Sequence, residues 1–345
     1  MKLMKKKLLI ILAGSGVLIL FILFLIYSTL FGSGIRPREN NRVIYIPTGS
    51  SYSQVLDTLE AHLTIKNPKV LKWVADKKKY PLLIKPGRYV IENDLSYIGL
   101  IDLLRSGRQM PVKITFNNVR SLNQIAGKIG KQIEADSLQI INFFSNESNF
   151  RDDGFKKETV IALFIPDTYE LYWNSDAKTL YARMLKEYKL FWNSQRLGKA
   201  KEKKLSPIEV AILASIIDDE VVKQNEKPRI AGVYLNRLRL GIPLQACPTI
   251  KFALNDFTIT RVLKKYLLVD SPYNTYKHNG FPPGPIGCPG IQGIDAVLNA
   301  DKHDYIYFAA KADFSGYHNF SKTLSEHNHY AALYQRELDK RKIFK

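Results

Sequence analysis

Cysteine and acidic residues are scarce in this 345-residue chain. Its two cysteines, Cys247 and Cys288, have no further cysteine or histidine at ligand spacing, so we expect no metal site. The sequence has no internal repeats and no low-complexity tracts, which excludes a solenoid or a repeat array. Asp and Glu number 32 against 51 Lys and Arg, and the net charge is +19. A chain this basic is expected to work among acidic partners: nucleic acid, anionic lipid or an acidic polymer.

The lysine clusters do not favour nucleic acid among these partners. They lie apart, at Lys77–Lys79, at Lys201–Lys204 and in the C-terminal KRKIFK, and most lack interleaved aromatic residues. Nucleic-acid sites usually combine a contiguous basic surface with aromatic side chains that stack on bases. We therefore interpret the clusters as solvated surface.

One long apolar run lies near the N-terminus. It extends from Leu8 to Phe31, about 24 residues without a charge, which is enough to cross a hydrocarbon core of about 30 Å. Four lysines precede it: Lys2, Lys5, Lys6 and Lys7. Positive charge of this kind normally stays in the cytoplasm, and the flank from Ser28 to Gly34 is nearly uncharged. The sequence therefore predicts a cytoplasmic tail (1–7), a transmembrane helix (8–31) and an outer part after about residue 35.

A cleaved signal peptide is the alternative reading of this run. The run is longer than the usual apolar region of a signal peptide, about 7–15 residues, and neither a convincing A-x-A site nor a lipobox cysteine follows it. We favour a retained anchor in the cytoplasmic (inner) membrane. The outer side permits disulfides, so Cys247 and Cys288, each followed by proline, are a candidate pair. The alternative is two small apolar residues.

A linker and a small module are expected after the apolar run. Residues 32–42 hold glycine, proline and charge, which is typical of a linker. Beyond them, strand and helix patterns alternate along the chain: 43–47, 49–62, 86–91, 95–104 and 112–116. Strands and helices in alternation predict a compact α+β module over 43–116.

A second, larger domain is expected towards the C-terminus. Residues 117–160 are predicted to be a helical connector. From Ile161 the composition changes, with helical patterns at about 176–196 and 206–223 and a long region rich in proline and glycine at 241–293. We expect residues 161–345 to form a mainly helical, mixed α/β domain.

The most informative segment begins at Ser206. The motif SPIE supplies an N-cap serine, a proline at the first helical position and a glutamate at the third, so the start of a helix is well defined. The next eight residues, VAILASII, are apolar on every side, which predicts a buried helix. This helix runs directly into three acids: Asp218, Asp219 and Glu220.

An acid at this position is expected to resist ionisation. The negative end of the helix dipole, burial and repulsion between neighbouring carboxylates all raise the pKa of whichever acid points inward. Such an acid stays protonated near neutral pH and can donate a proton to a leaving oxygen. The alternative is a helix that emerges into solvent, where the three acids form an ordinary charged end.

Residues 211–238, AILASIIDDEVVKQNEKPRIAGVYLNRL, resemble the core motif of the MltG (YceG-like) endolytic murein transglycosylases. GIPLQACPTIKFAL, SPYNTYKHNGFPPGPIGCPG and HNFSKTLSEHN resemble that family's later blocks in the same order, and FIPDTYELYW resembles an earlier one. GSSYSQVLDTLE and IKPGRYVI are similar to its LysM-like N-terminal module. The resemblance covers almost the whole chain after the apolar run. It implies an α+β fold with a transmembrane helix, a LysM-like module (43–116) and a YceG-like catalytic domain (161–345).

The resemblance also implies a reaction and a catalytic residue. The reaction is cleavage of the β-1,4 bond between N-acetylmuramic acid and N-acetylglucosamine in nascent peptidoglycan, with formation of a 1,6-anhydro ring and without a cofactor. The family's catalytic glutamate falls on Glu220. Asp218 stands where relatives often have another glutamate, so it is a second candidate acid. The two positions lie about 200° apart on a helix, so both cannot face one cleft.

Polar and aromatic residues beyond the helix are candidates for binding the sugars. They lie in loops and in the next predicted helix, where amides and aromatic faces meet what sugars require. The candidates are Asn236, Arg237, Gln245, Tyr273, Asn274, Thr275, Tyr276 and His318. A structural role is the alternative for each of them, as a surface pair, a partial core residue or a buried histidine.

The partners that the resemblance implies are glycan strands, the cytoplasmic membrane and the peptidoglycan synthesis machinery. Two other functions stay open. A muramidase-type hydrolase on the same fold would usually need a second carboxylate, and Asp167, Asp218 and Glu226 have no spacing that marks them out. A non-catalytic peptidoglycan-binding protein would need only the module and the basic surface.

Overall fold

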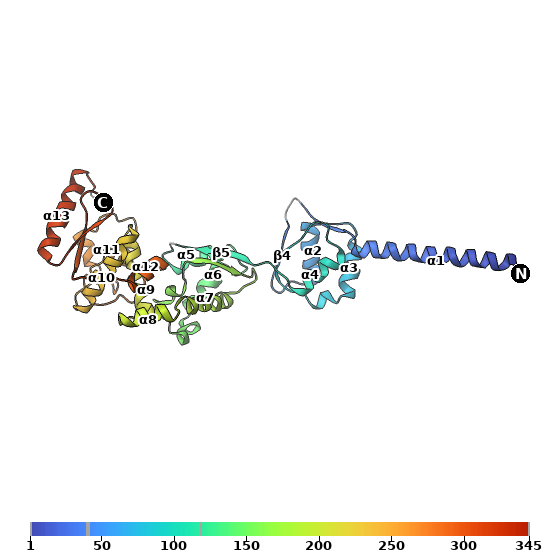
Figure 1. The fold of residues 1–345 in the computed structure, drawn as a ribbon, viewed down its shortest axis with the longest axis horizontal. Helices are drawn as coiled ribbons and strands as arrows, with labels where there is room; N and C mark the ends of the chain where they lie inside the picture. The colour runs from blue at the N-terminus through green and yellow to red at the C-terminus, as the bar shows by residue number, and fades with distance from the viewer. Residues whose placement is uncertain (1, 39–41, 118, 344–345) are drawn as a thin grey trace. The chain divides into compact units, whose positions relative to one another are not determined.

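The computed structural model describes residues 2–38, 42–117 and 119–343, and these form two compact units (Figure 1). The first unit contains the chain up to Lys113 and two short returning segments, 132–134 and 170–175. The second contains the remainder. Both units mix helices with short two-stranded sheets, so the expected α+β class is confirmed.

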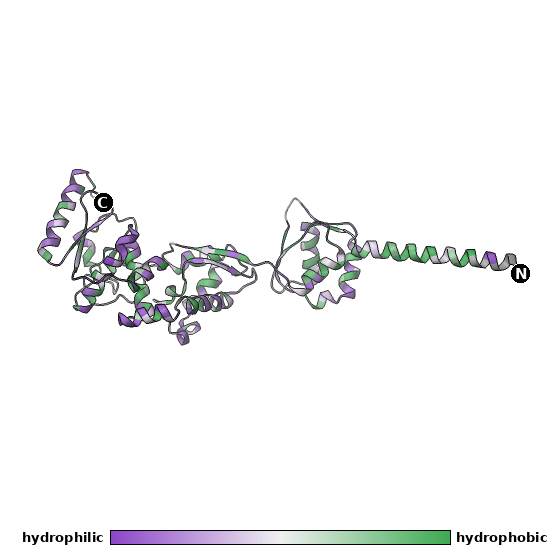
Figure 2. Ribbon diagram, viewed as in Figure 1, coloured by the Kyte–Doolittle hydropathy of each residue, from purple (hydrophilic) through white to green (hydrophobic). Residues whose placement is uncertain are grey.

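The first unit combines one long helix with a small module. Its elements are α1 (Lys2–Phe31), β1 (Ile35–Pro37), β2 (Val43–Ile46), α2 (Tyr52–His62), β3 (Leu63–Ile65), α3 (Pro68–Lys77), the 3-10 turn η1 (Tyr80–Leu82), β4 (Gly87–Val90) and α4 (Tyr97–Ser106). α1 is apolar along nearly its whole length, which Figure 2 shows in green. Its stretch from Ile10 to Phe31 is long and apolar enough to cross a membrane, and its side chains are not buried by the rest of the chain. The helix is therefore compatible with a single-pass anchor.

The residues directly after α1 are joined to the module by hydrogen bonds. β1 pairs antiparallel with β3, with Ile35 opposite Ile65. Gly34 N donates to Leu95 O at 3.2 Å, and Lys66 N donates to Gly34 O at 2.9 Å. We expected a linker over 32–42; within it the structure forms a strand at 35–37, and residues 39–41 lie outside the described residues.

The module is built on the antiparallel pair β2 and β4, with Val43 opposite Val90. The predicted strands and the helices α2 and α4 are confirmed, and the helix ends have the expected chemistry. Ser51 and Gln54 form a reciprocal capping box at the start of α2, and Gly107 ends α4 with φ +72°, a conformation that glycine adopts without strain. α3 was not among the predicted helices. The core of the module is made of fully buried side chains, among them Ile44, Ile46, Leu59, Tyr89, Leu100 and Leu104.

The second unit is mainly helical. Its elements are β5 (Val112–Phe116, its first two residues belonging to the first unit), α5 (Leu122–Ile129), α6 (Ser137–Ser145), β6 (Asp167–Leu171, likewise shared), α7 (Ala177–Phe191), α8 (Ser194–Glu202), α9 (Pro207–Glu220), α10 (Lys227–Arg239), α11 (Cys247–Ala253), α12 (Ile291–Leu298), β7 (Tyr307–Ala310), β8 (His318–Ser321) and α13 (Leu324–Lys340). Short 3-10 turns lie between them: η2 (Glu147–Asn149), η3 (Arg151–Asp153), η4 (Val160–Leu163), η5 (Gln224–Glu226) and η6 (Lys264–Leu268). β5 pairs with β6, and β7 with β8. α5 and α6 lie in the segment expected as a connector (117–160), and the structure groups them with the second unit.

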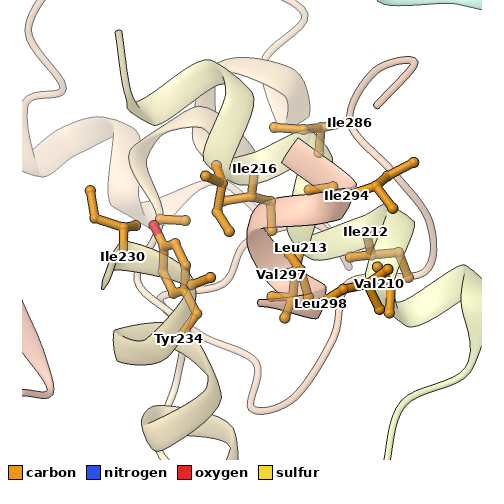
Figure 3. Close-up of a cluster of buried hydrophobic side chains, with 14 of the residues drawn as sticks. Val210, Ile212, Leu213, Ile216, Ile230, Tyr234, Ile286, Ile294, Val297 and Leu298 are labelled. Carbon is orange, nitrogen blue, oxygen red and sulfur yellow. The ribbon is translucent and has the colours of Figure 1, made fainter. Parts of the chain in front are cut away.

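α9 lies at the centre of the second unit. Ser206 and Glu209 form the predicted capping box, and every side chain from Val210 to Ile217 is buried. Figure 3 shows Leu213 and Ile216 of α9 beside Ile294 of α12, in the cluster that α10 also joins. Full burial of one such side chain contributes about 1.5–3 kcal/mol to stability, so this packing fixes where the end of α9 lies.

Candidate active site

Glu220 is the last residue of α9, and the chain turns into an extended conformation at Val221. Its side chain is only partly exposed. Burial raises the pKa of Glu220 to about 7; the nearby Lys251 ammonium opposes this shift and Asp219 adds to it. Among the described residues, the Glu220 carboxyl has no hydrogen bond and no ion pair. The group therefore titrates near neutral pH with its oxygens unengaged, which suits an acid that must also act as a base.

Three neutral polar side chains lie close enough to Glu220 to interact with its charge. They are Tyr234 of α10, Cys247 at the start of α11 and Tyr276 in a loop. Burial raises the pKa of Cys247 to about 11 and raises the pKa values of both tyrosines well above their ordinary value, so all three keep their protons at neutral pH. Cys247 Sγ and Tyr276 Oη are hydrogen-bonded at 3.2 Å, whereas the buried Tyr234 hydroxyl has no partner among the described residues. The carboxyl thus lies near three neutral polar groups, the Lys251 cation and the neighbouring Asp219.

The second candidate acid, Asp218, is engaged in structural contacts. Lys227 Nζ donates to its Oδ1 at 2.6 Å, and Gly290 N donates to its Oδ2 at 2.7 Å. The Lys227 side chain is 6% exposed and that of Asp218 is 24% exposed. Asp218 also lies against Gly293 so closely that a Cβ at this position would be 2.5 Å from Oδ1. Asp218 therefore ties the end of α9 to the start of α10 and of α12, and its contacts favour Glu220 as the reacting acid.

A cavity of about 630 Å³ adjoins the same end of α9, on the side of Asp218. Asp219, Gln224 and Lys227 are among its lining residues, and Glu220 is not. Arg120 and Asp219, which also line it, form an ion pair. This agrees with the helical geometry, which directs positions 218 and 220 to different sides.

Most of the predicted sugar-binding residues make structural contacts with the loops around the site. Asn236 Nδ2 donates to His303 O and Tyr305 O, at 2.7 and 3.0 Å. The buried Arg237 donates to Pro243 O, to Ile306 O and to Gln245 Oε1. Both side chains thus donate hydrogen bonds to neighbouring loops. These bonds fix the segment before β7 and the proline-rich loop relative to α10.

The loop at 273–276 is fixed in the same way. Asn274 is fully buried, and its Nδ2 donates to Leu267 O and Val269 O. Thr275 Oγ1 accepts a hydrogen bond from Ala246 N at 3.0 Å, and Tyr273 packs on Phe252. Of the predicted sugar-binding residues, the structure brings Tyr276 beside Glu220.

His318 and the cysteines have partners elsewhere. His318 Nδ1 lies 2.9 Å from Glu226 Oε2, and both side chains are largely buried. Cys247 and Cys288 are free thiols: Cys247 contacts Tyr276, and Cys288 Sγ donates to Phe164 O at 2.7 Å. The candidate disulfide is not formed in this structure.

Sequence reasoning missed two residues next to Glu220. Tyr234 reads as an ordinary core position of α10, and Lys251 as one surface lysine among many. Only the packing of α10 and α11 around the end of α9 brings them to the carboxyl. Neither position carries a signal in the sequence that could have singled it out.

We predict that Lys251 sets the upper pH limit of activity. If Glu220 is the acid, as the sequence predicts, it must be protonated to donate, so the rate should fall as the pH rises through about 7. Since the Lys251 cation lowers this pKa, Lys251→Met should raise it and move the falling limb of the pH–rate profile to higher pH. The profile of kcat/KM measures this. Lys201→Met, at an exposed lysine of α8, is the matched control and should leave the limb in place; equal limbs in wild type and Lys251→Met would contradict the prediction.

Comparison with known proteins places the chain in a family. The model of the YceG-like family matches residues 44–332. The chain is 32% identical over 304 residues to the endolytic murein transglycosylase of Bacillus subtilis (strain 168), covering 83% of this chain and 82% of that protein. It is 27% identical over 300 residues to the protein of the same name from Streptococcus pneumoniae (strain R6), of which it spans 53%. The crystal structure of a putative yceG-like protein from Listeria monocytogenes matches 83% of this chain and 97% of that one, with a TM-score of 0.53 and 28% identity. This chain belongs to the YceG-like family.

Proposed function

We propose that this protein is an endolytic murein transglycosylase, a lyase that cuts within peptidoglycan glycan strands, with Glu220 as its acid and base. The observation that carries the proposal is the contrast at the end of α9. Glu220 is partly buried, has a pKa of about 7 and makes no ion pair among the described residues, whereas Asp218 is bound to Lys227 and Asp219 to Arg120. The B. subtilis relative carries this activity in its name.

One group of this kind can serve both halves of the reaction. Glu220 donates its proton to the glycosidic oxygen as the bond to C1 of N-acetylmuramic acid breaks, and the leaving sugar departs as an alcohol. The carboxylate then takes the proton of the muramyl 6-hydroxyl, whose oxygen bonds to C1 and closes the 1,6-anhydro ring. Glu220 ends protonated, as it began, and no water is consumed. Lys251 stabilises the transient carboxylate, and Tyr234 and Tyr276 remain neutral donors beside it.

A muramidase-type hydrolase is the second candidate. Hydrolysis usually needs a second carboxylate as nucleophile or base. The acids considered for that role are engaged or exposed: Asp218 is paired with Lys227, Glu226 is bound to His318, and Asp167 is exposed. The arrangement therefore favours ring closure over attack by water.

Product analysis separates the two reactions. We expect the purified protein, acting on isolated glycan strands, to release fragments with 1,6-anhydro ends, which are lighter by one water than hydrolysed fragments. Mass spectrometry of the digest measures this difference. Fragments with ordinary reducing ends would instead support the hydrolase, and the absence of any cleavage would support a non-catalytic binding protein.

We also propose a place and an orientation for the chain. The lysines before the apolar run of α1 favour residues 1–7 in the cytoplasm and the catalytic part (161–345) outside, with the apolar run in the cytoplasmic membrane and the peptidoglycan synthesis machinery as neighbours. A reporter fused after residue 345 should be active only outside the cytoplasm.

The β2–α2–α3–β4 portion of the first unit, two paired strands flanking two helices, supports a LysM-like module that binds glycan.

A further inference from the structure

An apolar cavity lies between the last turns of α1 and the first turns of α3. Its volume is about 580 Å³, and it is lined by Leu25, Ile26, Thr29, Leu30, Lys69, Val70 and Trp73. Trp73 is 52% exposed, although tryptophan is a costly side chain to leave in water. The α3 residues that pack into the module, Leu71, Val74 and Ala75, lie on another face of the helix. Trp73 therefore presents an outward apolar surface that the module does not use, and Val70, which is partly buried against the module core, borders it.

The depth of this surface in a bilayer follows from α1. The apolar stretch of α1 ends at Phe31, so its residues 25–30 occupy about the last 9 Å of the span. Four of these residues, Leu25, Ile26, Thr29 and Leu30, line the cavity together with Trp73 and Val70. Directly after α1 ends, Gly34 is hydrogen-bonded to Leu95 and Lys66 of the module. These bonds limit the movement of α3 relative to α1. If α1 spans the membrane, the first turns of α3 must meet the boundary between acyl chains and headgroups.

The chemistry of the surrounding surface fits that boundary. The segment from Lys66 to Lys85 contains seven lysines and one acid, Asp76. Lys69 and Lys72 are exposed on α3, and Lys77 Nζ lies 5.9 Å from the centre of the Trp73 ring. Tryptophan is enriched where headgroups meet acyl chains, and lysine can place its stem along apolar surface with its charge towards phosphate. The exposed Leu82, in the following turn, adds a further apolar side chain.

We propose that α3 is a membrane-interface helix. Trp73 and the stem of Lys69 insert into the outer surface of the bilayer that α1 spans, and an anionic phospholipid occupies the cavity between the two helices, where it meets Val70. The module is then held against the membrane by two contacts, the span and this surface. The proposal rests on α1 being a membrane span and is independent of the proposed reaction.

Tryptophan fluorescence in nanodiscs tests the proposal. In a Trp173→Phe/Trp192→Phe background Trp73 is the only tryptophan, because the chain contains three. We expect acyl-brominated phospholipid to quench Trp73 by at least about twofold, since interfacial tryptophan lies next to the acyl chains. Replacing anionic phosphatidylglycerol by neutral phosphatidylcholine should weaken the quenching, and so should Lys69→Glu/Lys72→Glu.

The matched control keeps Trp173 as the only tryptophan, through Trp73→Phe/Trp192→Phe. Trp173 packs on Tyr45 in the module and should be quenched far less. Incorporation of the chain into the nanodisc reports separately whether α1 inserts. Quenching of Trp73 no stronger than that of Trp173, in discs that contain the chain, would overturn the proposal, as would protection of Trp73 by a second copy of the chain.

Discussion

Glu220→Gln is expected to lower the rate of glycan cleavage by roughly 10³-fold or more while leaving the fold intact. Glutamine keeps the size and shape of the side chain but can neither donate the first proton nor accept the second, so both steps lose their catalyst. Release of anhydro-ended fragments per unit time measures the loss. Asp218→Asn should retain at least part of the activity, because both oxygens of the Asp218 carboxylate accept structural hydrogen bonds, from Lys227 and Gly290.

Glu202→Gln is the matched control for this substitution, at an exposed glutamate of α8, and should cleave at the rate of wild type. An inactive Asp218→Asn beside an active Glu220→Gln would reverse the assignment of the acid. Such a result would also make the cavity on the side of Asp218 the catalytic cleft.

Glu220→Gln should also stabilise the folded protein at alkaline pH. The pKa of Glu220 is raised in the folded state, from 4.5 to about 7, so the folded protein binds the proton more tightly than the unfolded chain. Wild-type stability should therefore fall as the pH rises through this window, and the penalty is complete above about 7. Glutamine removes the penalty, a gain of at most about 3 kcal/mol at alkaline pH and none at pH values below 4.5.

Lys227→Met is expected to lower the free energy of unfolding by about 3 kcal/mol. The change leaves the Asp218 carboxylate partly buried, with the Gly290 N–H as its one remaining partner in the described part of the chain. Denaturant or thermal unfolding at neutral pH measures the loss. Lys322→Met is the matched control, because the Lys322–Asp304 pair is mostly exposed (58% and 78%) and should cost less than about 1 kcal/mol.

A double variant distinguishes a lost ion pair from lost packing. Asp218→Asn/Lys227→Met removes both charges, so it should be more stable than Lys227→Met alone. If Lys227→Met costs no more than Lys322→Met, Asp218 does not anchor the end of α9. The structural explanation of the difference between Asp218 and Glu220 would then fail.

The helix that carries the candidate acid was predictable because its signals are local. The capping box at Ser206 lies within four residues of sequence, and the eight apolar residues that follow leave no polar face. Together they placed both the start and the burial of α9, and hence an acid at a buried helix end.

What the sequence did not reveal depends on contacts between distant segments. The strand at Ile35–Pro37 exists because it pairs with Leu63–Ile65, and glycine, proline and charge alone suggested a linker. α3 was not predicted, and of its ten residues only Lys77 entered the sequence analysis, in a lysine cluster interpreted as solvated surface. Polar residues such as Asn236 and Arg237 looked like sugar ligands, but both donate hydrogen bonds to backbone carbonyls some 70 residues away in the chain.

The central claim is that Glu220 carries its proton near neutral pH, and a direct titration of this carboxyl tests it. Infrared difference spectra between wild type and Glu220→Gln isolate the C=O stretch of the protonated group as the pH is raised. We predict that this band persists to near neutral pH and disappears with a midpoint of about 7. A midpoint near 4.5, the ordinary value for glutamate, would contradict the account.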